Sequence, residues 1–574
     1  MNAMNRRRFF AWISAGGVTA LLAPEVVLAA STHQHRLTEA AIGRAKDLIG
    51  LELSHDERQL MAKAVEDHLG NYKKLREIPL PNSVSPALTF SPLLPGRKIE
   101  TKNEPARFSK VNASRPGNET PLAFMPLIEL AALIRERKIS SVELTQMYLG
   151  RLKRYNPALH CVITLTEDLA LTEARRADDE IGRGRYKGPL HGIPYGLKDL
   201  FAVKGYRTTW GAAPYKDQMI DEDATVVTRL RDAGAVLLAK TSVGALAWGD
   251  VWFDATTKNP WKLDQGSSGS SAGSASGTAA GCMAVGIGTE TLGSVISPSA
   301  RCGTTGLRPT FGRTSRYGGM ALSWSMDKVG VLARSVEDCA IVFDAMRGSD
   351  GKDGAVIDAP FPWDAGRNPK SLRIGFDEAA FKEKSDDAEF DQAALTTLKS
   401  MGFDLKPVKL PDFPVDQILF ILEAEAAAAF DDLTRSNRDD LMTVQIEDAW
   451  PNVFRAARFI PAVEYIQANR ARTLLMQHFE TTVADVDAYV HPSFGGNTLL
   501  ATNLTGHPSV IVPNGFRKDG TPAHITFTGK LFGEAETLLI AKAYQDETGF
   551  HKKHPDLDVE MAAAAEKQAV SSKH

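Results

Sequence analysis

The sequence contains few of the residues on which many metal, redox and nucleic-acid-binding proteins depend. Its 574 residues include only four cysteines, and neither a CxxC pair nor an HExxH motif occurs. These absences argue against the common zinc sites. We therefore interpret Cys161, Cys282, Cys302 and Cys339 as buried free thiols rather than as a metal or redox site. The 67 lysines and arginines are balanced by 70 aspartates and glutamates, which argues against a nucleic-acid binder with a basic excess.

The N-terminus also lacks an apolar run long enough for a permanent membrane helix. Arg6–Arg8 precede a mildly apolar run from Phe9 to Ala23, which is short and rich in glycine, serine and threonine. Small residues follow at Val27–Ala30, as at a cleavage site. The paired arginines resemble a twin-arginine export signal, although a chance basic N-terminus is the alternative. We predict that residues 1–30 are a signal peptide and that the mature chain is periplasmic or secreted.

The next hundred residues are predicted to form a helical extension and a connector. The whole segment 31–78 has a helical pattern, in which Ser54 and Glu57 form a capping box and Gly70 can end the helix. Nine prolines then occur from Pro79 to Pro126, and such a stretch cannot hold a regular helix or a central strand. We interpret residues 31–121 as a helical extension followed by an extended connector on the surface of the main domain.

From about residue 122, helical patterns alternate with short apolar runs. The strand-like runs are Cys161–Leu165, Ala235–Ala239, Met283–Ile287, Leu372–Phe376, Ala488–Val490 and Ser509–Val512. This alternation favours an α/β sheet covered by helices. Residues 415–480 are rich in helix signals and have no strand signal. We expect residues 556–574 to fray as a flexible tail, since they lack a clear apolar period.

Glycine and serine concentrate between residues 266 and 294. The segment begins with Gly266–Gly281, continues through an apolar run and ends at Thr289–Ser294. A flexible linker is one interpretation of this composition, but the strand-like Met283–Ile287 would bury the segment. Glycines let the backbone approach a ligand closely, and serines supply hydroxyl groups. Together they suit a site where backbone amides surround a reacting oxyanion.

Two other motifs can be considered for the same segment. A phosphate-binding P-loop is poorly supported, because no Gly-Lys-Ser/Thr follows the glycines. Gly269–Gly273 matches the GxSxG motif of esterases, which requires a strand immediately before the serine. We interpret the preceding residues, Asn259–Gln265, as a loop, which argues against an esterase motif here.

Lys198 is the second candidate for chemistry. It lies within the apolar run Leu190–Phe201, where a charged ammonium group would be costly to bury. Burial would lower the pKa of this lysine from about 10.4 towards roughly 7–8, the range of a general base. A solvated surface lysine is the alternative.

These motifs together resemble those of the amidase signature family. Leu190–Phe201 is similar to the family's lysine motif, which implies that Lys198 is the catalytic lysine. The glycine-serine segment and Thr289–Ser294 are similar to its other two motifs, which implies that Ser270 is the bridging serine and Ser294 the nucleophile. Agreement with the family's ungapped spacing between these two serines selects Ser270 over its neighbours Ser267, Ser268 and Ser271. The resemblance covers residues 122–550 and continues through 223–236, Cys302–Thr310, Gly312–Gly318, Tyr465–Ala468, Asp487, Asn503–Gly506 and Pro508.

The resemblance implies a fold and a reaction. The fold is a central mixed, twisted β-sheet covered by helices, within an amidase domain of residues 122–555. Neutral Lys198 takes a proton from Ser270, which takes one from Ser294, and Ser294 forms an acyl-enzyme with an amide. Backbone amides of Thr291, Leu292, Gly293 and Ser294 would stabilise the oxyanion. No metal or organic cofactor is needed.

The chain departs from the family pattern beside the nucleophile. Leu292 replaces a usual glycine, Ile296 replaces an arginine, and Arg301 stands where an aromatic residue is common. These changes are expected to affect substrate preference more than the reaction itself. We expect a small-molecule amide substrate, with no nucleic acid and no stable membrane span. The sequence leaves the oligomeric state open, with a homodimer as one option.

Two other functions stay open at this point. One is a catalytically inactive amidase fold that only binds ligands, against which the intact Lys198, Ser270 and Ser294 argue. The other is an amidotransferase-type subunit that works on charged transfer RNA inside the cell. The predicted export signal and the added N-terminal segment argue against that second function.

Overall fold

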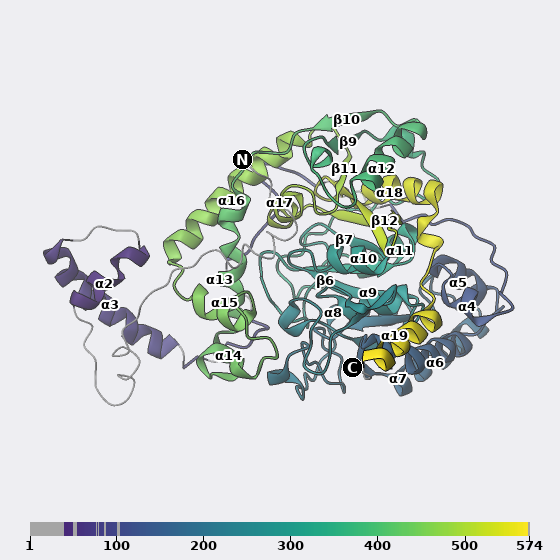
Figure 1. Ribbon diagram of the computed structural model, residues 1–574, viewed down its shortest axis with the longest axis horizontal. Coiled ribbons are helices and arrows are strands. Elements are labelled where there is room, and N and C mark those ends of the chain that lie inside the picture. Colours follow the sequence, from purple (N-terminus) through teal and green to yellow (C-terminus); the bar gives the residue numbers. More distant parts are fainter. Residues whose placement is uncertain are drawn as a thin grey trace.

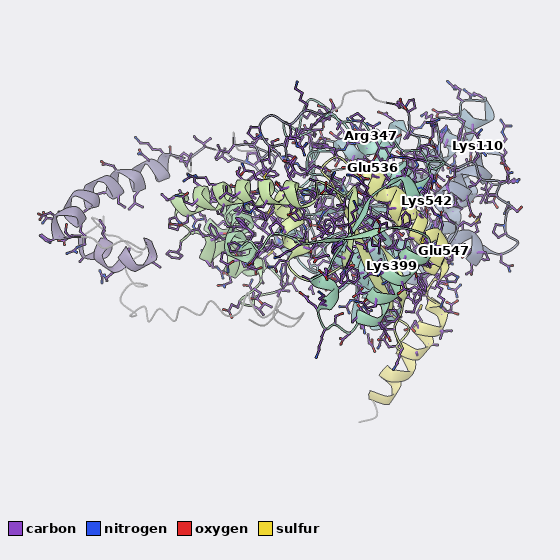
Figure 2. All side chains as sticks on the ribbon, turned by 90° about the horizontal axis from the view of Figure 1, so that it is seen from above. Lys110, Arg347, Lys399, Glu536, Lys542 and Glu547 are labelled. Carbon is purple, nitrogen blue, oxygen red and sulfur yellow. The ribbon has the colours of Figure 1, made fainter. Side chains whose placement is uncertain are left out.

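The structure is a computed structural model that describes residues 39–49, 54–75, 77–78, 80–84, 88–99 and 104–571. The predicted signal peptide, residues 1–30, lies outside the described residues. Two helices come first, α2 (Glu39–Ile49) and α3 (His55–Leu75), and both views show them extending away from the rest of the molecule (Figure 1, Figure 2). The helical prediction for this region is confirmed within the residues that the structure describes. The predicted end at Gly70 is wrong, because α3 continues to Leu75 and an interior glycine destabilises a helix by only about 1 kcal/mol.

An eleven-stranded sheet forms the centre of the molecule, with strand order β1-β3-β2-β6-β8-β7-β12-β13-β11-β9-β10. The strands are β1 (Val162–Leu165), β2 (Pro194–Lys198), β3 (Val236–Thr241), β6 (Val285–Glu290), β7 (Thr305–Arg308), β8 (Lys328–Ala333), β9 (Ile374–Asp377), β10 (Leu405–Val408), β11 (Ala488–Pro492), β12 (Ser509–Phe516) and β13 (Pro522–Gly529). Strand β2 runs parallel to β3 and β6, whereas β8 runs antiparallel to β6 and β7. The predicted mixed α/β sheet is therefore confirmed.

Helices surround this sheet (Figure 1). They include α6 (Ser141–Leu159), α7 (Glu167–Gly182), α8 (Thr225–Asp232), α9 (Ala272–Ala279), α10 (Ile296–Cys302), α11 (Val336–Met346), α12 (Ala388–Ser400), α17 (Thr498–Thr505) and α18 (Glu534–Thr548). Every residue of β2, β3 and β8 is buried, which explains why these strands are almost continuously apolar in sequence. The four cysteines are free and buried, as predicted.

The region predicted to be rich in helices is confirmed as such. It contains α13 (Phe420–Ala429), α14 (Asp431–Arg435), α15 (Trp450–Ala457) and α16 (Ala462–Thr482). The connector before the main domain is largely irregular, with the short helix α4 (Glu119–Ala123) near its end, before α5 (Leu127–Arg135). Among the described residues, every helix is too short or too polar to span a bilayer. Side chains such as Lys399 and Glu547 lie on the outer surface (Figure 2).

Two local predictions were wrong. The tail that was expected to fray forms α19 (Leu557–Ser571). Leu557 is buried, and the Asp558 carboxylate accepts hydrogen bonds from Arg154 and Tyr155 of α6, so the start of this helix is held by tertiary contacts. The expected loop before the GxSxG match instead forms a small hairpin of β4 (Lys258–Asn259) and β5 (Lys262–Gly266). Pairing between these two short strands gives the segment a structure that its sequence does not indicate.

Candidate active site

Lys198 is the last residue of β2 and is fully buried. Its Nζ lies 2.8 Å from Ser270 Oγ, 3.1 Å from Ser271 Oγ and 2.9 Å from Thr289 Oγ1. Burial lowers the pKa of Lys198 to about 7, although the negative charges of Asp327 and Glu290 oppose this change. The predicted burial of Lys198 is confirmed. An amine with such a pKa can exchange a proton with a hydroxyl group near neutral pH.

A second buried lysine on the neighbouring strand has different surroundings. Lys240 lies on β3, and its Nζ is 2.5 Å from the Asp199 carboxylate, with both side chains fully shielded from solvent. Burial lowers the pKa of Lys240, but Asp199 opposes this effect directly. Lys198 has only hydroxyl and carbonyl partners. Of these two lysines, Lys198 is therefore the one whose amine can serve as a base.

The serines of the glycine-rich segment have distinct partners. Ser270 is 1% exposed, and its Oγ contacts Lys198. The Ser271 hydroxyl accepts a hydrogen bond from the backbone N–H of Thr289 and donates one to its carbonyl, so it ties the segment to β6. Ser268 pairs with Ser297 through their hydroxyl groups, 2.7 Å apart. The geometry thus leaves Ser270 as the serine that is free to exchange a proton with Lys198.

Glycine is required where this segment passes another part of the backbone. A Cβ atom on Gly269 would lie 1.9 Å from the carbonyl oxygen of Gly249, a distance at which no side chain fits. Without a side chain at this position, the chain passes close enough for the next residue, Ser270, to reach Lys198. The close approach that the sequence analysis expected of these glycines is therefore present.

Ser294 lies in the loop between β6 and α10 and is 9% exposed. The Ser271 backbone N–H donates to the Ser294 carbonyl at 3.2 Å, which joins the two serine segments. Among the described residues, no hydrogen bond involves Ser294 Oγ or joins it to Ser270 Oγ. The structure thus brings Lys198 and Ser270 into contact, while the second step of the predicted proton relay stays a prediction.

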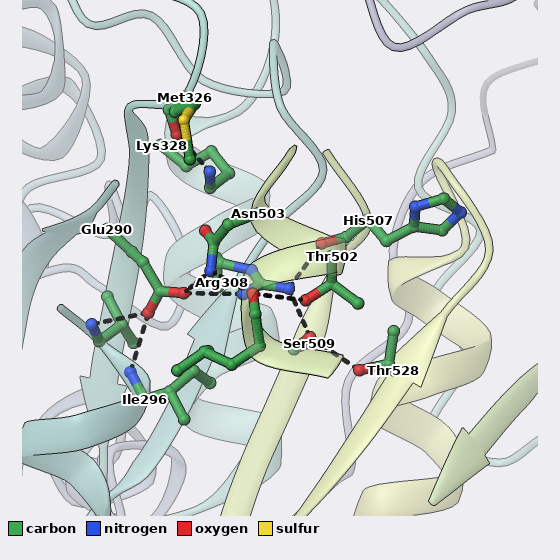
Figure 3. A network of polar contacts seen from close by, with 12 residues as sticks. Glu290, Ile296, Arg308, Met326, Lys328, Thr502, Asn503, His507, Ser509 and Thr528 are labelled. Carbon is green, nitrogen blue, oxygen red and sulfur yellow. Dashed lines mark hydrogen bonds and ion pairs between the residues drawn. The ribbon is translucent and has the colours of Figure 1, made fainter. Parts of the chain in front are cut away.

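A buried carboxylate holds this nucleophile loop (Figure 3). Glu290 accepts hydrogen bonds from the backbone N–H groups of Val295 and Ile296, at 2.8 and 3.0 Å. Its other oxygen accepts from Arg308 at 2.7 Å and from Asn503 at 2.9 Å. Burial by itself would raise the pKa of Glu290, but Arg308 and the hydrogen bonds lower it to about 2. Glu290, Arg308 and Asn503 lie within the motifs that resemble the family, but nothing in the sequence around them indicates this role.

The backbone around Ser294 has the features of an anion-binding loop. Within the described chain, the N–H groups of Thr291, Leu292, Gly293 and Ser294 have no protein acceptor, unlike those of the next two residues. Gly293 has a φ of 87°, whereas φ of Leu292 is not positive. A side chain is therefore tolerated at Leu292, and the departure from the family pattern at this position does not strain the backbone. Free N–H groups beside a hydroxyl suit a developing oxyanion.

The two other departures from the family pattern, Ile296 and Arg301, both contact neighbouring residues of the fold. Ile296 is 1% exposed and packs with Ala300 and Ile511. Arg301 donates a hydrogen bond to Gln265 of β5 at 3.2 Å. Both side chains thus contact neighbouring elements of the fold.

A small cavity adjoins the site. It has a volume of about 20 Å³, roughly the space of one water molecule. Thr289 and Thr291 line it on the side of the nucleophile loop, and Phe201, Met320 and Leu322 make much of the rest apolar. The cavity lies next to the amine of Lys198, because Thr289, which lines the cavity, accepts a hydrogen bond from this amine through Oγ1.

Several known proteins are similar to this chain over about three quarters of its length. The family model described as Amidase matches residues 143–502. A glutamyl-tRNA(Gln) amidotransferase subunit of Methylococcus capsulatus is 33% identical over 477 residues, covering 75% of this chain and 98% of that protein. Native peptide amidase from Stenotrophomonas maltophilia is a similar solved structure, with a TM-score of 0.68, 31% identity, and coverage of 76% of this chain and 99% of that one. An amidase family protein from Bacillus anthracis gives a TM-score of 0.67 at 26% identity, covering 76% of this chain and 93% of that one.

Proposed function

This chain belongs to the amidase signature family, and from that premise we propose that it hydrolyses carboxylic amides through an acyl-enzyme on Ser294. The observation that carries the proposal is the contact between Lys198 Nζ and Ser270 Oγ at 2.8 Å, in a buried site that lowers the pKa of Lys198 to about 7. The amine has no carboxylate partner there among the described residues, so it can be neutral at physiological pH.

The reaction has two halves. Neutral Lys198 takes the Ser270 proton while Ser270 takes the Ser294 proton, and Ser294 Oγ attacks the amide carbonyl carbon. Backbone N–H groups from Thr291 to Ser294 stabilise the oxyanion. The proton returns to the leaving nitrogen, the C–N bond breaks and an amine or ammonia departs. Water then attacks the acyl ester by the same proton route and releases a carboxylate.

The expected substrate is a small linear amide, and the expected location is the periplasm or the exterior of the cell. Both expectations rest on the sequence. The likeness to peptide amidase supports hydrolysis of an amide, whereas the likeness to a glutamyl-tRNA(Gln) amidotransferase subunit supports a role as an amidotransferase subunit. We favour hydrolysis because the chain has a predicted export signal. Fractionation of cells would decide the location, and the purified chain alone should be active if it is a hydrolase.

The test is a panel of aliphatic, aryl and peptide amides assayed with the purified mature chain. Ser294→Ala should abolish turnover and labelling by a serine-directed phosphonate without unfolding the protein. Ser297→Ala is the matched control, because Ser297 lies three residues away and pairs with Ser268. Turnover retained by Ser294→Ala would overturn the proposal. If the wild-type chain neither hydrolyses any amide of the panel nor is labelled by the phosphonate, the result would favour the alternative function of a catalytically inactive binding protein.

A further inference from the structure

The N-terminal connector contacts the active-site region, although it lies outside the residues that the family model matches. We propose that its residues Asn82 and Phe90 are positioning residues, which hold loop 319–327 against the nucleophile loop. This inference rests on the proposed function of Ser294. It assigns to the connector a role in the rate of the reaction rather than in the fold alone.

Asn82 joins the connector to one end of loop 319–327. Its side-chain Nδ2 donates to the carbonyl of Ala321 at 2.8 Å, and its Oδ1 accepts from the N–H of Ala321 at 2.7 Å. One amide side chain thus pairs with both backbone groups of a single residue, as a neighbouring strand would. Nδ2 also lies 3.5 Å from the carbonyl of Ala429 at the end of α13. These contacts fix the connector, the loop and α13 relative to one another.

Phe90 acts on the other end of the loop through an arginine. The guanidinium of Arg472, from α16, lies 3.6 Å from the centre of the Phe90 ring. Arg472 is 1% exposed and donates to Ser325 twice, to Oγ at 2.8 Å and to the carbonyl at 2.9 Å. The aromatic face stabilises a desolvated cation. The connector therefore supports loop 319–327 at both Ala321 and Ser325.

The loop in turn reaches the nucleophile loop. Backbone N–H groups of Leu322 and Ser323 donate to one oxygen of Asp327, at 2.8 and 3.0 Å. The other oxygen of Asp327 accepts from Thr291 Oγ1 at 2.6 Å. Thr291 is the first of the residues whose N–H groups are proposed to hold the oxyanion. A continuous set of contacts thus runs from Asn82 through Asp327 to Thr291.

The loop has a further anchor besides its contacts with the connector. Glu425 of α13 accepts hydrogen bonds from Ser323 Oγ and from both the N–H and the Oγ of Ser325, at 2.6 to 3.0 Å. Loss of the connector contacts should therefore shift the loop rather than unfold it. A shift would move Asp327 and loosen Thr291, which would weaken interactions made in the transition state and lower kcat more than it changes KM.

Two variants of the full chain test the connector contacts. Asn82→Asp keeps the shape and the acceptor oxygen but turns the donor towards Ala321 into an acceptor. Phe90→Leu keeps an apolar side chain but removes the ring from Arg472. Ser83→Ala is the control, because Ser83 is exposed and adjacent to Asn82. We expect kcat per phosphonate-titrated active site to fall roughly tenfold in Asn82→Asp, in line with the loss of one neutral hydrogen bond, and to be unchanged in Ser83→Ala.

Hydrogen exchange provides a readout that does not depend on turnover. Amides 321–323 should exchange faster in Asn82→Asp than in the wild type, while the melting temperature changes little. If amides 321–323 exchange in both variants as they do in the wild type, the connector contacts do not hold loop 319–327. Faster exchange with unchanged kcat per titrated site would overturn the positioning role. If the wild-type chain neither turns over nor binds the phosphonate, the proposed function fails, and exchange alone then tests the contacts.

Discussion

The carboxylate of Glu290 and the guanidinium of Arg308 form an ion pair in which both side chains are fully buried, with 2.7 Å between Oε1 and Nη1. The pair lies at the base of the nucleophile loop (Figure 3). Arg308 also donates to the carbonyl of His507 and to Ser509 Oγ, at 2.9 and 2.7 Å. The two charges therefore connect the loop that carries Ser294 to strands β7 and β12. A buried pair of this kind is stable only while its hydrogen bonds are satisfied.

Glu290→Gln should destabilise the protein strongly. The variant leaves Arg308 without a counter-charge and turns an NH₂ group towards existing donors, which should lower the free energy of unfolding by about 3–5 kcal/mol. Asp387→Asn is the control, because its bidentate ion pair with Arg517 is about one quarter exposed, so its loss should destabilise the protein less than loss of the fully buried pair. Urea unfolding of both variants measures the difference. Equal losses in the two variants would contradict the role of the buried pair.

The pH dependence of the reaction should report the pKa of Lys198. Burial lowers this pKa to about 7, and the amine must be neutral to accept a proton. kcat/KM should therefore be low in acid, rise with pH through about 7 and level off above it, because this parameter reports the free enzyme. Lys198→Arg, which stays charged, should be inactive at every pH. An acid limb centred near the ordinary lysine value of 10.5 would contradict the lowered pKa of Lys198.

Much of the candidate site could be predicted from the sequence because its signals are local. Lys198 stands within an apolar run, which predicts burial, and the resemblance to the family's ungapped motif selects Ser270 from four nearby serines. The strand-like runs likewise correspond to β1, β3, β6, β9, β11 and β12. Each of these features can be recognised within one continuous segment of the chain.

The supporting structure could not be predicted, because it joins distant segments. Glu290 meets Arg308 and Asn503 only after β6, β7 and α17 have packed together. Asn82 meets Ala321 across more than two hundred residues. Nothing beside these residues in sequence indicates their partners, since a buried ion pair or an amide contact has no periodic pattern.

Lys198 and Ser270 should behave as one unit in mutant kinetics. Lys198→Ala and Ser270→Ala each interrupt the same proton path, so each should lower kcat by about 10²–10⁴. The double variant should be no slower than the slower single variant, within a few-fold, because effects of residues that act together do not add. Asp387→Asn combined with Lys198→Ala is the control, and its effects should add, since the two sites share no partner. Full additivity for Lys198 and Ser270 would show that the two act separately.

Gly293→Ala should separate the geometry of the proposed oxyanion loop from general stability. Gly293 has a φ of 87°, and an added Cβ would lie 3.3 Å from Leu499 Cδ2, so alanine is strained there by about 1–2 kcal/mol. Gly520 has a φ of 82° with nothing within 4 Å of an added Cβ. Gly520→Ala should therefore lower the melting temperature about as much as Gly293→Ala does. Displaced N–H groups at Gly293 should lower kcat about tenfold or more, whereas Gly520→Ala should keep the wild-type kcat. Equal kcat values in the two variants would remove the support for an oxyanion site at this loop.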